Sequence, residues 1–455
     1  MVLDHETLLP AGSRGAGGRR RHLNGLLWLV GAVSVVLALV RVFFLVWHRS
    51  PLDFDIYMMG GSHFFGGHLY TVRYPSPQLG FTYPPFSALA FSPLALVPRQ
   101  PAQYLWGLVD LAALAGLLAL SLRAVRPAMS GRELTQWSLV LMTPAIWLDP
   151  VKLTFSYGQV NIVLAVLVLA DLTGRVRIGG HVLPEGVLTG LAAAAKLTPL
   201  IFVPYLFLVR RARSAAVALA TFVGAALVVA VLGPSTSWEY WTKYAFDAGR
   251  VGSNSYISNQ SLSGVLERVH HGVVAHSVYY GMDLVLAVAG MALAVWAYRQ
   301  SSHFLGLLVC ATVGMVVSPI TWVHHMVWIV PILLWLSLAG DRPRGGRLWA
   351  GAAAVLFWTA PIWSLPYGGS GQELHEHGWQ VLLGNSYFLA MMVFLLGVAL
   401  MLLRRSHPST PAAPRDRGSA AAAGAAGTTD LTGPAARPGD RPAARPGDRP
   451  GARVV

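Results

Sequence analysis

Two acids, Asp53 and Asp55, stand in a segment rich in aromatic, glycine and proline residues that follows the first long apolar run. The chain is otherwise poor in charge, with only 12% Asp, Glu, Lys and Arg. A carboxylate at a membrane boundary can take a proton from a sugar hydroxyl, because apolar surroundings keep its pKa high enough for a base. Positions two apart do not share a helix face, so we expect one acid rather than a pair to be the general base. The alternative for either acid is a helix N-cap.

Three further side chains could bind an anionic group at the same boundary. Lys196 interrupts an apolar stretch at KLTP, 196–199, and a lysine at membrane depth needs a partner or a function. Its alternative is an ammonium that snorkels to the interface. His324 and His325 end the sequence SPITWVHH, and adjacent positions do not direct two rings at one metal ion. For them we expect interfacial packing, or hydrogen bonds to a phosphate or sugar, with no metal and no cofactor.

Two other polar clusters are weaker candidates. Asn259 and Gln260 are uncharged hydrogen-bonding residues that suit carbohydrate hydroxyls. The sequence ELHEHGW carries His375 and His377 two positions apart, whereas the helical zinc peptidase motif places its histidines four apart. We interpret ELHEHGW as a solvated loop. The aromatic residues of the 50–86 loop, with Trp238, Tyr240 and Trp241, are expected to anchor the membrane interface rather than to bind sugar.

The elements that must position these residues are predicted to be membrane helices. The chain has 455 residues, of which 54% are hydrophobic, and this composition indicates an all-α polytopic membrane protein. Two apolar regions, 185–209 and 304–339, are interrupted and are predicted to be broken helices. A short run at 86–97 is predicted to lie at membrane level or to be re-entrant. About twelve membrane helices result, with uninterrupted candidates at 24–47, 102–122, 135–149, 157–173, 214–233, 278–298, 347–364 and 384–403.

The basic residues assign sides to the loops. Arg19, Arg20 and Arg21 precede the first helix, so residues 1–23 are predicted to be cytoplasmic, and that helix to be a signal anchor. Residues 24–404 then form the membrane domain. The polar candidates all fall on the extracytoplasmic side, and both termini are predicted to be inside. The long outer loops of this domain are 48–85, 234–277 and 365–383.

Composition also excludes several classes of protein. Residues 405–455 are rich in Ala, Pro, Gly and Arg and are predicted to be a disordered cytoplasmic tail. The net charge of +14 comes largely from helix ends and this tail, so we expect no nucleic-acid partner. Cys310 is the single cysteine, which excludes a disulfide within one chain.

Six sequence motifs together carry a resemblance to a known family. In this order and at these spacings the chain resembles glycosyltransferase family 87, over residues 24–404. The resemblance implies a C-type glycosyltransferase fold in the cell membrane, and a polyprenol-phosphate-mannose donor. It also implies a glycolipid acceptor of the phosphatidylinositol mannoside or lipomannan type, and an α-(1→2) linkage formed with inversion at the extracytoplasmic face. The motifs are DFDIY, YPPF, SYGQVN, GLAAAAKLTP, SNQSLSGVLER and SPITWVHHMVW.

The same resemblance implies roles for particular residues. By motif position Asp55 would be the general base and Asp53 its replacement candidate, while Lys196 and His324 or His325 would bind the donor phosphate. Candidates for substrate binding come from the same motifs: Tyr57, Tyr83, Gln159, Asn161, Asn259 and Gln260. Three alternatives stay open: transfer of arabinose or glucose from a lipid phosphate, a lipid or sugar transporter, and a membrane scaffold. A transporter predicts internal inverted repeats, and we find none in the sequence. The oligomeric state stays open.

Overall fold

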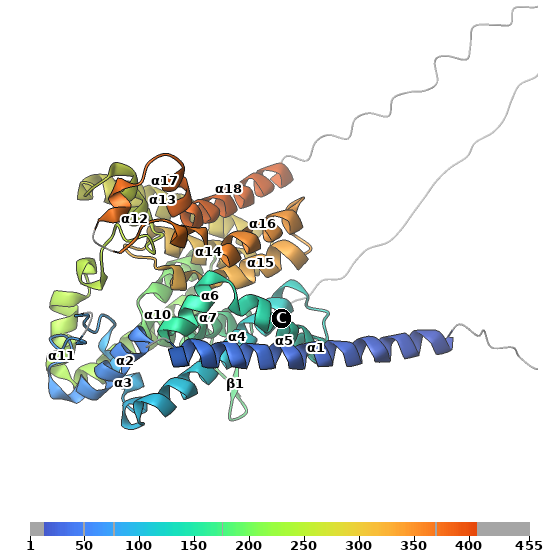
Figure 1. Cartoon of the computed structure of the whole chain (residues 1–455), viewed down its shortest axis with the longest axis horizontal. Coiled ribbons are helices and arrows are strands. Elements are labelled where there is room, and N and C mark those ends of the chain that lie inside the picture. The colour runs from blue at the N-terminus through green and yellow to red at the C-terminus, as the bar shows by residue number, and fades with distance from the viewer. Residues whose placement is uncertain (1–12, 49–50, 76–77, 175, 369–370, 407–455) are drawn as a thin grey trace, which may run out of the picture. The chain divides into compact units, whose positions relative to one another are not determined.

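The computed structural model describes residues 13–48, 51–75, 78–174, 176–368 and 371–406 (Figure 1). The predicted disordered tail lies outside these residues, except that the last helix continues to Ser406. The first half of the described chain contains α1 Ser13–His48, α2 Leu52–His63, α3 Pro85–Phe91, α4 Arg99–Val125, α5 Gly131–Ile146, α6 Asp149–Tyr157, α7 Asn161–Thr173, α8 Val187–Ala195 and α9 Phe202–Leu208. The second half contains α10 Ala212–Leu232, α11 Pro234–Glu239, α12 Leu262–His270, α13 His276–Gln300, α14 His303–Val317, α15 Ile329–Leu338, α16 Gly346–Thr359, α17 Trp379–Gly384 and α18 Ser386–Ser406.

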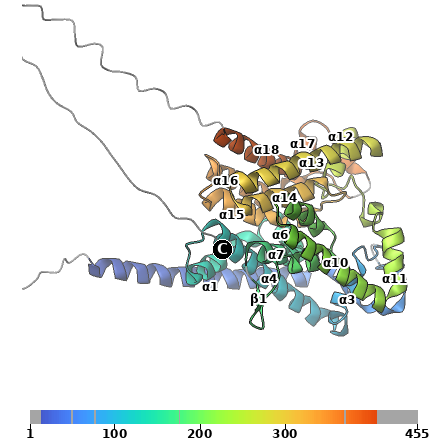
Figure 2. The ribbon, with the colours of Figure 1, turned by 180° about the vertical axis from the view of Figure 1, so that it is seen from behind.

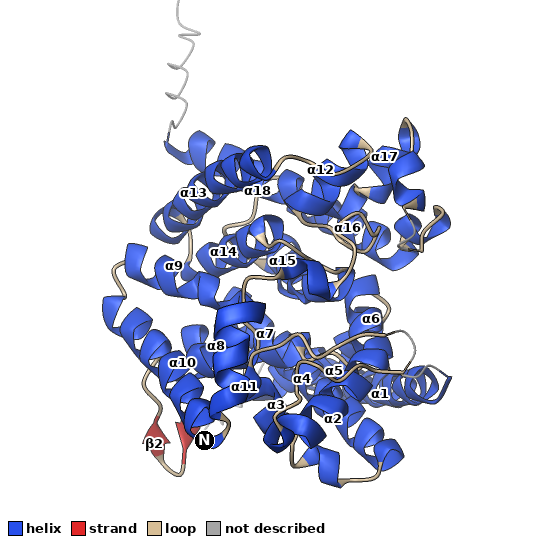
Figure 3. Ribbon diagram, turned by 90° about the vertical axis from the view of Figure 1, so that its left-hand side faces the viewer, coloured by secondary structure: helices blue, strands red, loops and turns tan. Residues whose placement is uncertain are grey.

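The described chain is mostly helical, as the composition predicts. Its only β-structure within the described residues is a two-residue antiparallel ladder, β1 Arg177–Ile178 with β2 His181–Val182, and isolated bridges (Figure 3). Within the described residues, five helices are long and apolar enough to cross a bilayer, and a sixth span results if the bent pair α6–α7 is taken as one. The prediction of several apolar helices is therefore confirmed, while the number twelve and the C-type fold stay predictions. The five spans are 22–45 within α1, α4, α10, α13 and α18.

The structure confirms both predicted helix breaks. α8 ends at Ala195, Lys196 is extended with φ −152° and ψ 129°, and a 3₁₀ turn at Thr198–Ile201 leads into α9. α14 likewise ends at Val317, before Ser318 and Pro319, and the chain resumes helical structure at Val323. Proline has no amide hydrogen to donate and restricts the residue before it, which accounts for breaks at these positions. Because of these breaks, each of the two regions forms short apolar helices instead of one long span.

The bounds of the helices differ from those predicted, and for three of them the structure shows the physical reason. The expected 135–149 helix is α5, which starts four residues earlier because Ser130 and Glu133 form a capping box. The expected 157–173 helix starts only at Asn161, because the chain bends by 116° between α6 and α7. The expected 347–364 helix, α16, ends at Thr359, where Ala360 adopts φ +51°.

Helices pack side by side, both between neighbours along the chain and between more distant elements, to form one buried apolar core. α1 packs on α5, α4 on α7, α8 on α10, and α13 on α14, while α15 contacts α4 and so joins the two halves of the chain. Figures 1 and 2 show α2, α11, α12 and α17 toward one end of this bundle. The N-terminal end of α1 and the C-terminal end of α18 point toward the other end.

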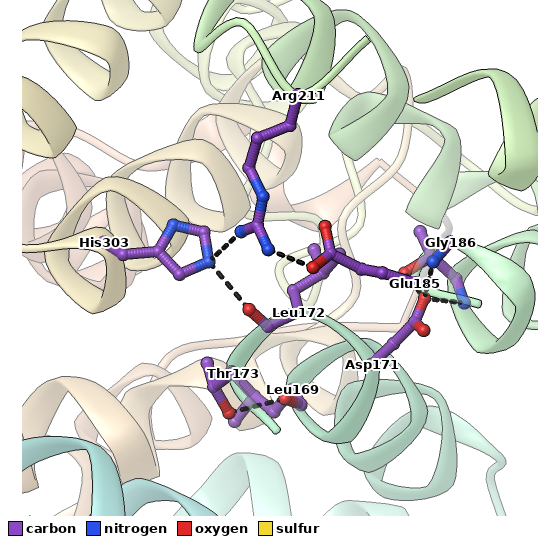
Figure 4. A network of polar contacts seen from close by, with 9 residues as sticks. Leu169, Asp171, Leu172, Thr173, Glu185, Gly186, Arg211 and His303 are labelled. Atoms are coloured by element: carbon purple, nitrogen blue, oxygen red, sulfur yellow. Dashed lines mark hydrogen bonds and ion pairs between the residues drawn. The ribbon is translucent and has the colours of Figure 1, made fainter. Parts of the chain in front are cut away.

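A polar network fixes the segments at the predicted cytoplasmic ends of α7, α8, α10 and α14 (Figure 4). Asp171 accepts hydrogen bonds from the backbone amides of Gly186 and Thr189, at 3.0 and 2.9 Å, and so caps α8. Arg211 pairs with Glu185 and lies 2.7 Å from Nε2 of His303. These contacts provide hydrogen-bond and ion-pair partners for helix-end amides and charged side chains that would otherwise be buried without them.

Candidate functional site

A cavity of about 480 Å³ joins the segments singled out in the sequence. Its walls come from α2, the strand-like segment before α3, the bend between α6 and α7, the break after α8, and the 240–251 and 318–325 segments. Of the residues predicted to act in the site, the following line it: Asp53, Tyr83, Gln159, Lys196, His324 and His325.

The two acids of α2 have different surroundings. Asp55 is 5% exposed and accepts hydrogen bonds from Arg99, at 2.7 and 2.6 Å, and from the hydroxyl of Tyr74, at 3.0 Å. It is not among the residues that line the cavity, whereas Asp53 is. Neither acid is an N-cap, because Pro51 holds that position and both acids lie in the first turn. The structure therefore places the replacement candidate, Asp53, at the cavity and the favoured candidate, Asp55, in an ion pair.

Asp53 has the environment that a general base needs. Its carboxylate hydrogen-bonds Gln159 and lies within the field of Lys196. Burial raises the pKa of Asp53 from 3.8 to about 6, although the Gln159 hydrogen bond and the Lys196 charge oppose this rise. A carboxylate with a pKa near 6 is deprotonated at neutral pH and is still a better proton acceptor than an ordinary aspartate.

The bend at Gly158 brings Gln159 to Asp53. Gly158 has φ +66°, and a Cβ there would lie 2.6 Å from Cβ of Phe54, so only glycine fits this approach of α6 to α2. Trp106 donates a hydrogen bond to the Gly158 carbonyl at 2.9 Å. The side-chain oxygen of Gln159 then accepts from Tyr57 at 2.8 Å and from Tyr83 at 3.3 Å. Tyr57 is fully buried and outside the cavity lining, so it positions Gln159.

Lys196 is a buried cation without an ion-pair partner among the described residues. Its Nζ donates to Oδ1 of Asn161 at 2.8 Å, lies 2.9 Å from Nε2 of His325, and lies 5.2 Å from the ring centroid of Tyr83. His325 also hydrogen-bonds the backbone of Ile320. With Nε2 accepting from the ammonium, the proton of His325 is on Nδ1. The cation is thus held in place by neutral groups, and its charge is free for an anionic ligand.

His324 differs from its neighbour. Both of its ring nitrogens are buried and have no hydrogen-bond partner among the described residues. Its backbone carbonyl accepts from Asn161 at 2.9 Å and from Thr154 at 3.3 Å, and its ring packs against Tyr157. Among the described residues no group of three or more His, Cys, Asp and Glu side chains could hold a metal ion. The two histidines therefore contribute hydrogen-bonding nitrogens beside the lysine.

Asn259 and Gln260 do not line the cavity, although the sequence predicts that they bind substrate. Both are fully buried, and their polar atoms bond other parts of the chain. Oδ1 of Asn259 accepts from the Thr321 amide at 2.9 Å, and Nε2 of Gln260 donates to the Gly384 carbonyl at 2.7 Å. They hold the 318–325 segment and α17 in place, since a buried amide side chain must satisfy its donors and acceptors internally.

The prediction of a solvated loop at ELHEHGW is wrong for its two glutamates. Glu373 is fully buried and Glu376 is 3% exposed, near the guanidinium of the fully buried Arg268. Burial raises the pKa of Glu376 to about 7, against the opposing charge of Arg268. The local sequence pattern did not predict the burial of these glutamates, because their partner Arg268 lies about a hundred positions earlier in the chain.

The sequence also missed Arg250, which lines the cavity beside Tyr244 and Tyr240. The sequence does contain a signal for Arg250. Because the positive-inside rule leaves few basic residues in outer loops, each basic residue in such a loop is a candidate functional residue. Arg99 could have been found by the same reasoning. It stands at the start of α4 with a partly exposed side chain and holds Asp55.

A second, narrower cavity of about 60 Å³ continues from the first. The two share Thr198, Ser318 and His325, and the remaining wall of the narrow cavity is almost wholly apolar. Asn161 lines this narrow cavity rather than the larger one. Because His325 lines both cavities and contacts Lys196, an anionic group bound there would lie beside this largely apolar cavity.

Comparisons with known proteins identify the family of the chain. The pattern of glycosyltransferase family 87 matches residues 81–319. A protein of Mycobacterium tuberculosis (strain ATCC 25618 / H37Rv) is 32% identical over 411 residues, which are 86% of this chain and 93% of the relative. It is named polyprenol-phosphate-mannose-dependent alpha-(1-2)-phosphatidylinositol mannoside mannosyltransferase. A protein of the same name from Mycolicibacterium smegmatis (strain ATCC 700084 / mc(2)155) is 31% identical over 82% of this chain and 90% of its own.

A further relative is named for a pentamannoside acceptor. The polyprenol-phosphate-mannose-dependent alpha-(1-2)-phosphatidylinositol pentamannoside mannosyltransferase of Mycobacterium tuberculosis (strain CDC 1551 / Oshkosh) is 33% identical over 77% of this chain and 79% of its own. No solved structure matches the chain at a significant level. The family match covers more than half of the chain, and the relatives cover most of it. The chain therefore belongs to glycosyltransferase family 87.

Proposed function

We propose that the chain transfers mannose from polyprenol-phosphate mannose to a lipid-linked mannoside and forms an α-(1→2) linkage with inversion. The relatives' names support the donor and the linkage. The observation that carries the proposal is the shared cavity of Asp53, Lys196 and the two histidines. A base and a fixed cation in one cavity are what a single displacement on a lipid-linked sugar phosphate requires.

The proposed reaction has one step. Asp53 takes the proton of the acceptor 2-hydroxyl, and that oxygen attacks the anomeric carbon from the face opposite the phosphate. The bond between the anomeric carbon and the phosphate oxygen breaks through an oxocarbenium-like state, and its electron pair leaves with the phosphate. Lys196, supported by His325, stabilises the charge that develops there. A β-linked donor then gives an α-linked product.

We further propose that the donor enters from the outer leaflet. The basic residues beside the helix ends support an extracytoplasmic cavity with both chain termini in the cytoplasm. The first isoprene units of the donor would occupy the narrow apolar cavity that opens at His325. Because fixed side chains supply the positive charge, we expect transfer to persist in the presence of EDTA.

Purified protein in liposomes tests the function directly. With radiolabelled polyprenol-phosphate mannose and a phosphatidylinositol mannoside, we expect a labelled glycolipid from which an α-(1→2)-specific mannosidase releases the label. The matching arabinose and glucose donors serve as controls and should give at most slow transfer. Donor movement across the membrane without a new glycoside would favour a transporter, and preferred transfer of arabinose or glucose would overturn the choice of mannose.

A further inference from the structure

A second cation, Arg250, lines the cavity at a place distinct from that of Lys196. Its guanidinium lies 4.2 Å from the ring centroid of Tyr244 and 5.2 Å from that of Tyr70. One terminal nitrogen, Nη2, donates to the carbonyl of Phe81. The other, Nη1, is buried and has no partner among the described residues. This arginine is therefore held rigidly while one of its donors is left free.

The contacts of Arg250 and of Lys196 have no residue in common. Lys196 contacts Asn161, His325 and the Tyr83 ring, and it is the cation that acts on Asp53. No carboxylate in the described part of the chain lies within ion-pairing distance of Arg250. One lysine with a histidine is sufficient for one leaving phosphate, so the cavity has a second positive site for a second anionic group.

Aromatic side chains surround this second site. Tyr70 stacks on Tyr240, with ring centroids 5.5 Å apart, and Tyr240, Tyr244, Tyr280 and Trp322 line the cavity together with Arg250. Aromatic residues present flat apolar faces and, for tyrosine, a hydroxyl at the edge. Such a wall suits a sugar ring, which has apolar C–H faces and hydroxyls around its rim. A glycan bearing an anionic group matches both features.

We propose that Arg250 binds the phosphodiester of the acceptor lipid, and that the aromatic wall around it holds the acceptor's sugars. This inference rests on the proposed mannosyl transfer and assigns the two cations of the cavity to two substrates. Lys196, which lies over the Tyr83 ring, binds the donor phosphate beside Asp53, and Arg250, which donates to the Phe81 carbonyl, binds the acceptor headgroup. The enzyme then prefers anionic glycolipids to neutral mannosides, because a charge-assisted hydrogen bond from a guanidinium to a phosphodiester is stronger than one to a sugar hydroxyl.

Two acceptors and one substitution test this assignment. Wild type and Arg250→Gln are reconstituted in liposomes and assayed with a phosphatidylinositol mannoside and with a neutral alkyl α-mannoside. For the anionic acceptor we expect kcat/KM to fall on the order of 10- to 100-fold, as for the loss of a charge-assisted hydrogen bond. For the neutral acceptor and for the donor KM we expect changes of less than about twofold. Arg250→Lys, which keeps the charge, should restore part of the loss.

The neutral acceptor also controls for folding, since a misfolded variant loses activity with both acceptors. Lys243→Gln is the matched control: it removes a charge from the same segment, but its side chain is 65% exposed and lies outside the cavity lining. In a variant whose thermal midpoint matches that of wild type, equal losses with both acceptors would overturn the assignment, and so would a raised donor KM, which would place Arg250 in the donor site. If wild type transfers no mannose to either acceptor, the proposed function itself fails.

Discussion

Arg99 donates two parallel hydrogen bonds to Asp55, from Nε to Oδ1 at 2.7 Å and from Nη2 to Oδ2 at 2.6 Å. Asp53 precedes Asp55 by two positions on the same helix and is turned roughly 200° away from it. That rotation carries Asp53 to the cavity that also contains Lys196. The two acids therefore differ in what they can do: Asp55 fixes α2 to the start of α4, and Asp53 is available to a substrate.

The first prediction concerns Asp53. In Asp53→Asn the amide keeps the size of the side chain but cannot accept the hydroxyl proton, so we expect kcat to fall by about 10²- to 10⁴-fold. The measurement is the initial rate of mannose transfer at saturating donor. The thermal midpoint should not fall, because a neutral amide replaces a desolvated carboxylate. A rate near that of wild type would remove Asp53 from the mechanism.

The second prediction concerns the ion pair. Asp55→Asn leaves the Arg99 guanidinium with a weaker acceptor, and we expect a loss of about 1–3 kcal/mol in the free energy of unfolding. Arg99→Gln should give a similar loss, and the double variant should lose less than the sum of the two. Thermal unfolding in detergent checks this. If Asp55→Asn unfolds like wild type yet is inactive, Asp55 rather than Asp53 is the base.

The third prediction is a pH profile. Because burial raises the pKa of Asp53 to about 6, kcat/KM should fall as pH drops from 7 through 6. The raised pKa of Asp53 has the opposite effect on folding stability, which decreases as pH rises. The folded protein binds this proton more tightly than the unfolded chain, so the contribution is present below pH 4 and is lost as pH rises toward 6. Activity lost at pH 5 should therefore return at pH 7.5, and a profile that stays flat down to pH 4.5 would contradict the assignment.

How far the sequence could lead is clearest at α2. The spacing of Asp53 and Asp55 was enough to predict that they do not act as a pair, and the structure confirms that they face different surroundings. Choosing between them depended on Arg99, which lies 44 positions away and becomes a neighbour only when α4 packs beside α2. Local patterns carry no information on such a contact.

The helix breaks at Lys196 and at Ser318 could be predicted from the sequence, because their causes lie in neighbouring residues. Proline, and a polar residue in an apolar run, act on the backbone locally. The roles of Asn259 and Gln260 were not predictable, because an amide side chain looks the same in a sequence whether it bonds a sugar or a backbone carbonyl. Their burial decides between the two, and burial is a property of the packed chain.

The fourth prediction tests the path of the donor lipid. Gly314 lines the narrow cavity, and an ideal Cβ at this position would already lie 3.1 Å from Cγ2 of Ile201 on its other wall. The leucine side chain of Gly314→Leu should therefore occupy space in the narrow cavity that the donor's isoprene units are proposed to fill. We expect the donor KM to rise by about tenfold or more while the acceptor KM changes little. Steady-state rates at varied donor and fixed acceptor concentration, and the reverse, separate the two constants.

Gly351→Leu is the control for adding a leucine to an apolar helix. A Cβ at Gly351 in α16 would meet no heavy atom within 4 Å, so this variant should keep both KM values. If Gly314→Leu raised the acceptor KM and left the donor KM unchanged, the narrow cavity would bind the acceptor lipid rather than the donor. The phosphate at Lys196 would then face a chain that leaves the cavity by another route, and the orientation of the donor in the proposed reaction would have to be reversed.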